Sequence, residues 1–325
     1  MSTPISAAPT GLASYLTTQA VAQTEALEYI KKRRSGEITS LTTPWQKFND
    51  MHVDGIEMGR IITVAGMSGS GKSLIINQLC SELHALNPHD SFAILNFNFE
   101  MASREILLRH VISKSGLTNK ELLSANGVML GDQEMLRVEF LLSKEQANTS
   151  IYYCEYPKTV AQYVKICREF SRVHNKKVIF TSDHSVLFRK SDSERSATEM
   201  LYALGDASIE LKKEIDCTQL HISQLNREIE DEHRKMKKKG ANYPIKGDLF
   251  GGDALFMCAD TVMVNHRPIL MNFPANSYGP DGFACGPTDI YWHFLKLRQG
   301  DPGIAHMRAD FGRFKIYDKV NPPSL

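Results

Sequence analysis

The chain has 325 residues and a formal net charge of +1 at pH 7, with 42% hydrophobic and 23% charged residues. This hydrophobic content is ordinary for a globular protein, and the length is enough for a large core. The small net charge excludes a general attraction to nucleic acid, so any basic surface must be local. No run approaches 18 continuous apolar residues, which excludes a membrane-spanning helix.

The N-terminal segment and the cysteines both indicate a cytoplasmic protein. Residues 1–9 are small and uncharged, without the basic stretch and apolar core of a signal peptide. No two cysteines have C-x-x-C spacing and several lie in apolar runs, so reduced thiols are expected. The six cysteines are Cys80, Cys154, Cys167, Cys217, Cys258 and Cys285.

The first predicted element is a helix from about 19 to 34, with basic residues in its last turn and Gly36 as its C-terminal cap. We expect a poorly ordered tail over 1–18, a linker helix over 19–36 and one large domain over 37–325. The length allows two domains, but the motifs below run from 59 to 318 without a break. The apolar side of the helix would cover either this domain or a neighbouring subunit. That apolar side is formed by Ala22, Ala26, Leu27, Tyr29 and Ile30.

Residues 66–73 read Gly-Met-Ser-Gly-Ser-Gly-Lys-Ser, a complete G-x-x-x-x-G-K-[ST] phosphate loop. An apolar run enters the loop and a helical pattern leaves it, as such a loop requires. Lys72 is expected to reach the β- and γ-phosphates of ATP, and the Ser73 hydroxyl to ligate Mg²⁺. A chance match to a glycine turn is the alternative, and both flanks argue against it. The predicted phosphate-binding residues are Gly66, Ser68, Gly69, Ser70, Gly71, Lys72 and Ser73.

Strand and helix patterns alternate after this loop, which predicts right-handed crossovers and a parallel sheet covered on both faces. The expected strands are 91–97, 151–154, 177–182 and 218–223, and the expected helices are 103–115, 118–125, 131–147, 160–174 and 197–215. The C-terminal part differs, because it shows only strand patterns, at 261–264, 290–298 and 304–308. The last two strands flank Gln-Gly-Asp-Pro-Gly, which predicts a β-hairpin.

Three polar residues follow predicted strands and should meet at the sheet edge that carries the phosphate loop. We expect Asp183 to orient Mg²⁺, Glu100 to polarise the attacking water and Gln224 to sense the γ-phosphate. The alternatives are structural. Either carboxylate could cap or begin a helix, and Gln224 could be an ordinary residue at a strand end.

In this order the motifs resemble those of the hexameric replicative DNA helicases of the DnaB type, within the RecA-like ATPases. The resemblance covers roughly 20–318, and its most specific parts are the phosphate loop, Ser223-Gln224-Leu225-Asn226-Arg227 and Lys296-x-Arg298. Further segments match other parts of the family. Lys32–Gly36 resembles its linker helix, and Leu41–Trp45 resembles the opening strand of its domain. Phe99-Glu100-Met101 resembles its Leu-Glu-Met motif, and Arg109 stands where it has an arginine in the next helix. Asp248-Leu249 and Ala259-Asp260 match its DNA-loop segment.

The resemblance implies an α/β fold of the RecA-like P-loop ATPase type, with a mostly parallel twisted central sheet flanked by helices, a C-terminal β-hairpin and an N-terminal linker helix. It implies ATP and Mg²⁺ as cofactors and a nucleotide contact for Arg109. It also implies a homo-oligomer, expected to be a hexamer, in which Lys296 and the arginine finger Arg298 act on the ATP of the adjacent subunit. The alternative for this pair is a solvent-facing edge strand.

Members of the family hold single-stranded DNA on loops that correspond here to 184–196 and 228–253. The second loop is basic, so it could follow a phosphate backbone, and a solvated charged loop is the equal alternative. This chain has Asp-Leu-Phe-Gly-Gly-Asp at 248–253 in place of the usual Asp-Leu-Arg-Glu-Ser-Gly, so the backbone-contacting arginine is absent. The DNA-binding candidates are Arg234, Lys235, Lys237, Lys238, Lys239, Lys246, Gly251 and Gly252.

These features predict an ATP-driven 5′-to-3′ DNA helicase motor that moves on single-stranded DNA as a ring, with the direction taken from the resemblance. About 18 residues stand where the family carries an N-terminal helical domain, so we expect a trimmed helicase core; a loader or a primase is its further suggested partner. A RecA-like DNA-dependent ATPase without unwinding (a recombinase, loader or regulatory ring) is the first alternative. The second is a scaffold that binds ATP without turnover, against which Glu100, Asp183 and Gln224 argue.

Overall fold

The computed structural model describes residues 16–88, 92–125, 130–147, 150–232, 234, 242–251, 253–280 and 282–319. The chain divides into two compact units, residues 1–40 and 41–325. The first unit contains the helix α1 (Gln19–Ser35), which is confirmed close to its predicted bounds. The Thr18 side chain caps its start by accepting from the Val21 N–H, and Gly36 ends it with a φ of 76°. Leu27 and Ile30 are 53% and 61% exposed, and what covers them stays a prediction.

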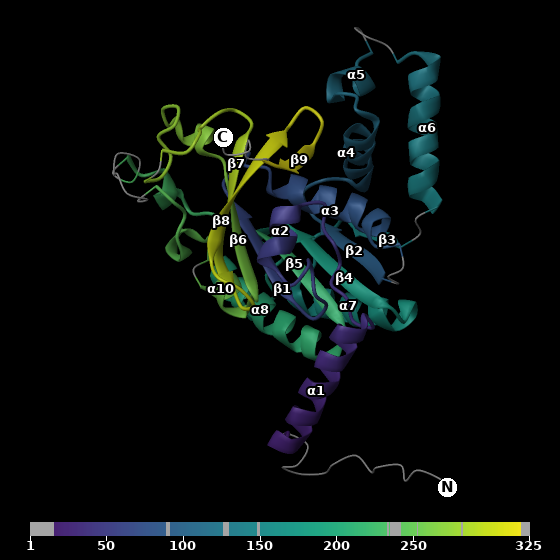
Figure 1. Ribbon diagram of the computed structural model, residues 1–325, viewed down its shortest axis with the longest axis vertical. Helices are drawn as coiled ribbons and strands as arrows, with labels where there is room; N and C mark the ends of the chain where they lie inside the picture. The colour runs from purple at the N-terminus through teal and green to yellow at the C-terminus, as the bar shows by residue number, and fades with distance from the viewer. Residues whose placement is uncertain are drawn as a thin grey trace. The chain divides into compact units, whose positions relative to one another are not determined.

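The second unit is built on a nine-stranded sheet in the order β3-β2-β4-β5-β1-β6-β7-β8-β9 (Figure 1). The strands from β3 to β6 in this order are parallel, and those from β7 to β9 are antiparallel. Their bounds are β1 (Ile61–Gly66), β2 (Phe92–Asn98), β3 (Ile151–Cys154), β4 (Lys177–Asp183), β5 (Cys217–Gln224), β6 (Thr261–His266), β7 (Asp289–Leu297), β8 (Gly303–Asp310) and β9 (Lys315–Asp318). The predicted fold class is therefore confirmed.

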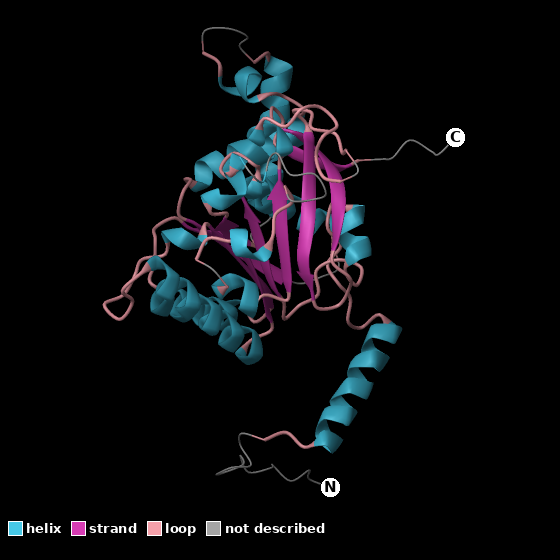
Figure 2. Cartoon of the chain, turned by 90° about the vertical axis from the view of Figure 1, so that its left-hand side faces the viewer, coloured by secondary structure: helices cyan, strands magenta, loops and turns pink. Residues whose placement is uncertain are grey.

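Helices cover both faces of the sheet, as Figure 2 shows. Their bounds are α2 (Gln46–Met51), α3 (Lys72–Leu86), α4 (Ser103–Ser115), α5 (Asn119–Leu123), α6 (Asp132–Ala147), α7 (Val160–His174), α8 (Ala197–Glu214) and α10 (Ala254–Cys258). Short 3₁₀ turns lie in the connections at Ser185–Leu187, Arg227–Glu230, Lys246–Asp248 and Pro268–Met271. None of the helices among the described residues has the length and apolar character needed to cross a membrane.

Two apolar cores form because successive residues of a strand point to opposite faces of the sheet. On one face Ile61 and Ala65 of β1 pack with residues of α7, α8 and α10. On the other face Ile62 and Val64 pack with α3 and with Trp45 at the start of α2. The sheet is thus buried on both sides, as the runs of β-branched residues in its parallel strands require. All six cysteines are free thiols, and five of them are buried.

The prediction that 41–45 forms an opening strand is wrong. Only a single antiparallel bridge joins Leu41 to Ile56, and the chain then enters α2. The apolar residues of this segment serve burial rather than strand pairing, since Trp45 packs edge-on against Trp292 with ring centroids 5.0 Å apart. The helices α2 and α10 and the strand β9 were not expected. They are only four to six residues long, and segments of this length show periodicity in some cases, as in β3, but not in others.

Candidate active site

The phosphate loop joins β1 to α3 at the C-terminal edge of the sheet. Gly71 has a φ of +96°, a conformation that side chains with a Cβ rarely adopt. A side chain from a distant strand supports the loop, because the Asn265 amide donates to the Ser70 carbonyl over 2.7 Å. Asn265 in turn accepts from the Trp292 indole N–H over 2.9 Å. This buried chain of hydrogen bonds fixes the loop against β6 and β7.

Lys72 is the first residue of α3, and its ammonium group turns back over the loop to donate to the Met67 carbonyl over 2.7 Å. Burial lowers the pKa of Lys72, and the charges of Asp183 and Glu100 act in the opposite direction. The cation is thus held inside the glycine turn with two carboxylates nearby. This is the position from which it can bind the phosphate chain of a nucleotide.

The strand registers bring the other predicted residues to the same edge. Gly66 at the end of β1 pairs with Gln224 at the end of β5, and Asn98 at the end of β2 pairs with Asp183 at the end of β4. Glu100 follows two residues after Asn98 and precedes α4. A cavity of about 280 Å³ opens between them. Its lining is formed by Ser68, Gly69, Gly71, Lys72, Ser73, Leu74, Glu100, Arg109, Asp183, His184, Gln224, Phe311 and Phe314.

Asp183 and Ser73 have the oxygen groups and the placement that suit Mg²⁺. The Asp183 carboxylate accepts a hydrogen bond from Ser73, and burial raises the pKa of Asp183. Its Oδ1 atom is buried and has no hydrogen-bond partner among the described residues. The part of the chain that the structure describes holds no cluster of three or more His, Cys, Asp or Glu residues for a metal. A site with few protein ligands is what Mg²⁺ takes when phosphates and water complete its coordination.

Arg109 comes from α4 and lines the same cavity. Its guanidinium lies 4.9 Å from the centroid of the Phe314 ring. Burial lowers the pKa of Arg109, with Asp183, Glu105 and Glu100 acting in the opposite direction. The site therefore holds two cations, Lys72 and Arg109, among its carboxylates, which suits a polyanionic ligand.

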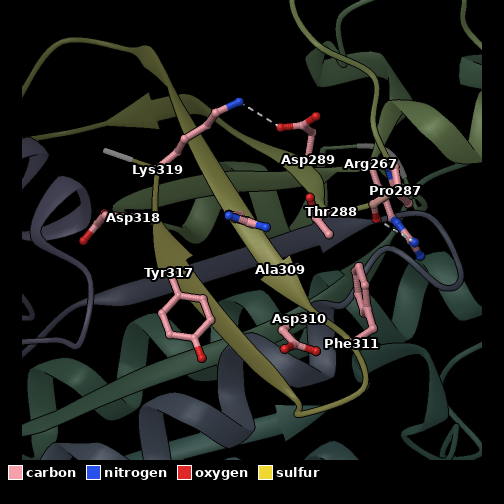
Figure 3. Close-up of a pocket in the computed structure, with 11 residues that line it drawn as sticks. Arg267, Pro287, Thr288, Asp289, Ala309, Asp310, Phe311, Tyr317, Asp318 and Lys319 are labelled. Carbon is pink, nitrogen blue, oxygen red and sulfur yellow. Dashed lines mark hydrogen bonds and ion pairs between the residues drawn. The ribbon is translucent and has the colours of Figure 1, made fainter. Parts of the chain in front are cut away.

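A second cavity, of about 900 Å³ (Figure 3), lies beside the first, and Phe311 lines both of them. Arg267 stacks on the Phe311 ring at 4.0 Å from its centroid. The Arg267 guanidinium also donates to the Gly69 carbonyl of the phosphate loop over 3.4 Å and to the Pro287 carbonyl over 3.0 Å. An aromatic face and a guanidinium plane thus stand beside the phosphate loop.

Sequence reasoning missed several residues of this region: His184, Asn265, Arg267, Phe311 and Phe314. His184 directly follows Asp183, and burial lowers its pKa. Asn265 lies in β6, Arg267 directly follows that strand, and Phe311 and Phe314 lie in the turn between β8 and β9, so all four stand about 190 residues or more beyond the phosphate loop. The aromatic pair in Phe-Gly-Arg-Phe at 311–314 was the one local signal that could have drawn attention to this turn.

Arg298 does not line either cavity. Its backbone N–H donates to the Asp260 carbonyl, and the Asp260 N–H donates to the Ile61 carbonyl, so Arg298 lies level with the start of β1. The phosphate loop begins at Gly66, five residues further along that strand, or roughly 16 Å away at about 3.3 Å per residue. Lys296 lies on the same hairpin, and its ammonium group donates to the Phe256 and Met257 carbonyls. Arg298 thus lies at the opposite edge of the sheet from its own phosphate loop.

The predicted DNA-binding residues that the structure describes have partners within the chain. Arg234 forms an ion pair with Asp248, whose side chain is 1% exposed, and donates to the Tyr243 carbonyl over 2.7 Å. Lys246 pairs with the exposed Asp253 at 2.9 Å. Gly251 has a φ of +79° and packs closely on α8, so backbone geometry alone requires a glycine there. The remaining candidates, Lys235, Lys237, Lys238, Lys239 and Gly252, lie outside the described residues.

Comparison with known proteins places this geometry in context. The family model of the DnaB-like helicase C terminal domain matches residues 40–314. The replicative DNA helicase DnaB of Mycoplasma genitalium is 27% identical over 255 residues, covering 75% of this chain and 50% of the relative. That of Buchnera aphidicola subsp. Acyrthosiphon pisum is 22% identical over 236 residues, covering 72% of this chain and 48% of the relative. The chain thus spans about half the length of the curated relatives it matches.

Two solved structures share the fold. One is an isolated ATPase domain, which superposes with a TM-score of 0.77 at 15% identity, over 94% of this chain and 100% of that one. The other is a DnaB-like replicative helicase, described together with its interactions with primase. It superposes with a TM-score of 0.73 at 15% identity, over 92% of this chain and 67% of that one.

Proposed function

The chain belongs to the DnaB-like helicase C-terminal domain family, and from that premise we propose that it is the ATP-hydrolysing motor of a ring-shaped DNA helicase. The observation that carries the proposal is the convergence of Lys72, Glu100, Asp183 and Gln224 on one cavity at the phosphate loop. A scaffold that only binds ATP would have no need of this full set.

Five polar residues of the cavity have roles in phosphoryl transfer to water. Lys72 binds the β- and γ-phosphates, and Glu100 orients and deprotonates the attacking water. Gln224 donates a hydrogen bond to the γ-phosphate, and its strand connects this contact to the loop that follows β5. Ser73 and Asp183 would hold Mg²⁺, which would neutralise charge on the transferred phosphoryl group.

The adenine base of the nucleotide is proposed to lie against Phe311, in the second cavity. Phe311 borders both cavities, so a nucleotide whose phosphates occupy the loop can extend its base past this ring. Stacking on an aromatic ring or on a guanidinium plane such as that of Arg267 stabilises a base without requiring base-specific hydrogen bonds.

Completion of the site is proposed to require a second copy of the chain. Arg298 cannot reach its own phosphate loop from the opposite edge of the sheet, whereas on a neighbouring subunit it can serve as an arginine finger, with Lys296 beside it. Repetition of such a head-to-tail contact closes a ring if the rotation between subunits permits it. The apolar side of α1 would then cover the adjacent subunit, and six subunits are the number that the family suggests.

Single-stranded DNA is the proposed track, with movement in the 5′-to-3′ direction. The loops that would contact it follow β4 and β5, so they begin at Asp183 and Gln224, on the edge where ATP binds. A loader or a primase is the further partner proposed, and one of the structural neighbours is described with primase.

An ATPase assay with and without single-stranded DNA, together with a mass measurement, tests the proposal. We expect turnover to increase with DNA and to belong to a multi-subunit species. Lys72→Ala should abolish turnover, and Lys165→Ala, an exposed lysine of α7, is the matched control. Turnover that DNA leaves unchanged would count against a DNA motor. DNA-stimulated turnover without separation of a duplex would favour the RecA-like DNA-dependent ATPase without unwinding, and binding of ATP without any turnover would favour the scaffold.

Mixed rings test whether Arg298 acts between subunits. Arg298→Ala should lower turnover on the order of 10³-fold while leaving nucleotide binding intact, because the residue lies outside its own subunit's cavity. Mixing Arg298→Ala with Lys72→Ala should restore part of the turnover, since intact phosphate loops then meet intact fingers. Absence of any restoration across all mixing ratios would count against the contact between subunits.

A further inference from the structure

Asp260 lies directly before β6, at the edge of the sheet that carries Arg298. Its side chain is 4% exposed and accepts from several groups at once. Lys212 of α8 donates to its two oxygens over 3.1 and 2.8 Å. The Ile61 N–H donates to Oδ2 over 2.8 Å, and one guanidinium nitrogen of Arg298 lies 3.1 Å from Oδ1. The carboxylate is therefore fixed from two other elements before it meets Arg298.

The Arg298 side chain is held from one side only. It is 51% exposed, and within the part of the chain that the structure describes Asp260 is its one ion-pair partner. A guanidinium has five N–H donors in a planar fork, so a single contact through one terminal nitrogen leaves donors on the other side for a further anion. The exposed side of the group is thus available to a ligand outside this subunit.

A second buried carboxylate holds the next residue of the hairpin turn. The Gln299 amide donates over 2.8 Å to Glu57, whose side chain is 8% exposed and also pairs with Arg60. The turn is therefore anchored at two consecutive positions, by Asp260 and by Glu57. Such anchoring fixes the direction in which Arg298 leaves the strand.

From these contacts we propose that Asp260 is a positioning residue for Arg298, which orients the guanidinium toward the nucleotide of the adjacent subunit. This inference rests on the proposed role of Arg298 between subunits. The reason is geometric: a half-exposed arginine samples many rotamers, and a rigid carboxylate behind it restricts them to those that point outward. Displacement of a catalytic group by about 1 Å can cost on the order of 100-fold in rate.

The contact with Ile61 gives a competing explanation that the test must separate. Ile61 begins β1, which runs to the subunit's own phosphate loop, so a change at Asp260 could act on that loop instead. The two routes differ in what they change. Loss of positioning lowers turnover without weakening nucleotide binding, whereas distortion of the phosphate loop weakens binding in the same subunit.

The experiment compares Asp260→Asn, Arg298→Ala and the double variant in DNA-stimulated turnover and in nucleotide affinity. We expect Asp260→Asn to lower kcat about tenfold with an unchanged dissociation constant for the nucleotide. The double variant should be no slower than Arg298→Ala alone, because Asp260 then has no finger to orient. A double variant slower than Arg298→Ala by the full Asp260→Asn factor would overturn the inference, as would wild-type turnover in Asp260→Asn.

Two further variants distinguish a loss of positioning from a loss of folding. Asp260→Glu keeps the charge opposite Lys212 but displaces the carboxylate by one methylene, so turnover should fall. Its melting temperature, measured in parallel, shows whether the fall reflects a loss of folding instead. Lys212→Met removes one of the groups that fix Asp260 but keeps the carboxylate beside Arg298, so turnover should fall less than in Asp260→Asn. An equal loss in the two variants would overturn the positioning role, because it would follow from disruption of the buried pair alone. If Arg298→Ala itself keeps full turnover, the proposed function fails rather than the positioning inference.

Discussion

At the residue scale, Phe311 is the side chain through which the two cavities meet. If the adenine base rests on this ring, Phe311→Ala should weaken ATP binding about tenfold, a typical loss for one base–aromatic stack. Equilibrium titration with ATP measures the effect. Tripolyphosphate, which has no base, is the matched ligand, and its affinity should not change. An equal loss for both ligands would mean that the ring supports the phosphate loop, against which it packs at Gly71.

The residues of the site differ in whether local sequence could reveal them. Lys72 and Ser73 stand in a contiguous motif, and Asp183 and Gln224 end apolar strands, so patterns within ten residues were enough to predict that they meet at one edge. Asn265 of β6 and Phe311 of the turn between β8 and β9 reach the phosphate loop from about 190 residues or more away along the chain. The aromatic pair around Phe311 could draw attention to its turn, but local sequence cannot place either residue at the phosphate loop, because that position depends on the order of strands in the sheet.

At the element scale, the strands and long helices predicted from periodicity lie within one or two residues of their observed ends, as at α4 and α7. The parallel strands are buried runs, so their apolar residues mark them clearly. The short elements α2 and β9 were not predicted, because tertiary contacts rather than local periodicity stabilise them. Trp45 at the start of α2 donates its indole N–H to the Ile316 carbonyl of β9 over 3.1 Å, across 271 residues.

The start of α2 is capped by a residue from the other end of the domain. The Asp318 carboxylate accepts from the Gln46 and Lys47 backbone N–H groups over 2.7 and 3.1 Å. Asp318→Ala should lower the free energy of unfolding by about 1 kcal/mol, as loss of a helix cap does. Urea denaturation measures it, and Asp50→Ala, an exposed acid in the same helix, is the control with little expected change. Equal effects of the two variants would argue against a capping role.

At the scale of the whole molecule, the second unit buries several histidines in their neutral form. Burial lowers the pKa of His110 and of His266 to about 3 and that of His221 to about 4. In the unfolded chain these groups titrate near 6.5. Between these values the unfolded state binds more protons than the folded state, so stability is present above pH 6.5 and is lost as the pH falls toward 4.

The loss of folding stability at acidic pH should therefore become less steep when one buried histidine is removed. His110→Leu takes away one group whose protonation is linked to unfolding, so the slope of unfolding free energy against pH between 6 and 4 should fall by up to about 1.4 kcal/mol per pH unit. Urea denaturation across this range measures the slope, which is separate from any uniform loss caused by altered packing around α4. His174→Leu at the end of α7 leaves the buried set intact and serves as the control. A slope in His110→Leu as steep as in the wild type would mean that other groups, rather than this histidine, govern acid unfolding.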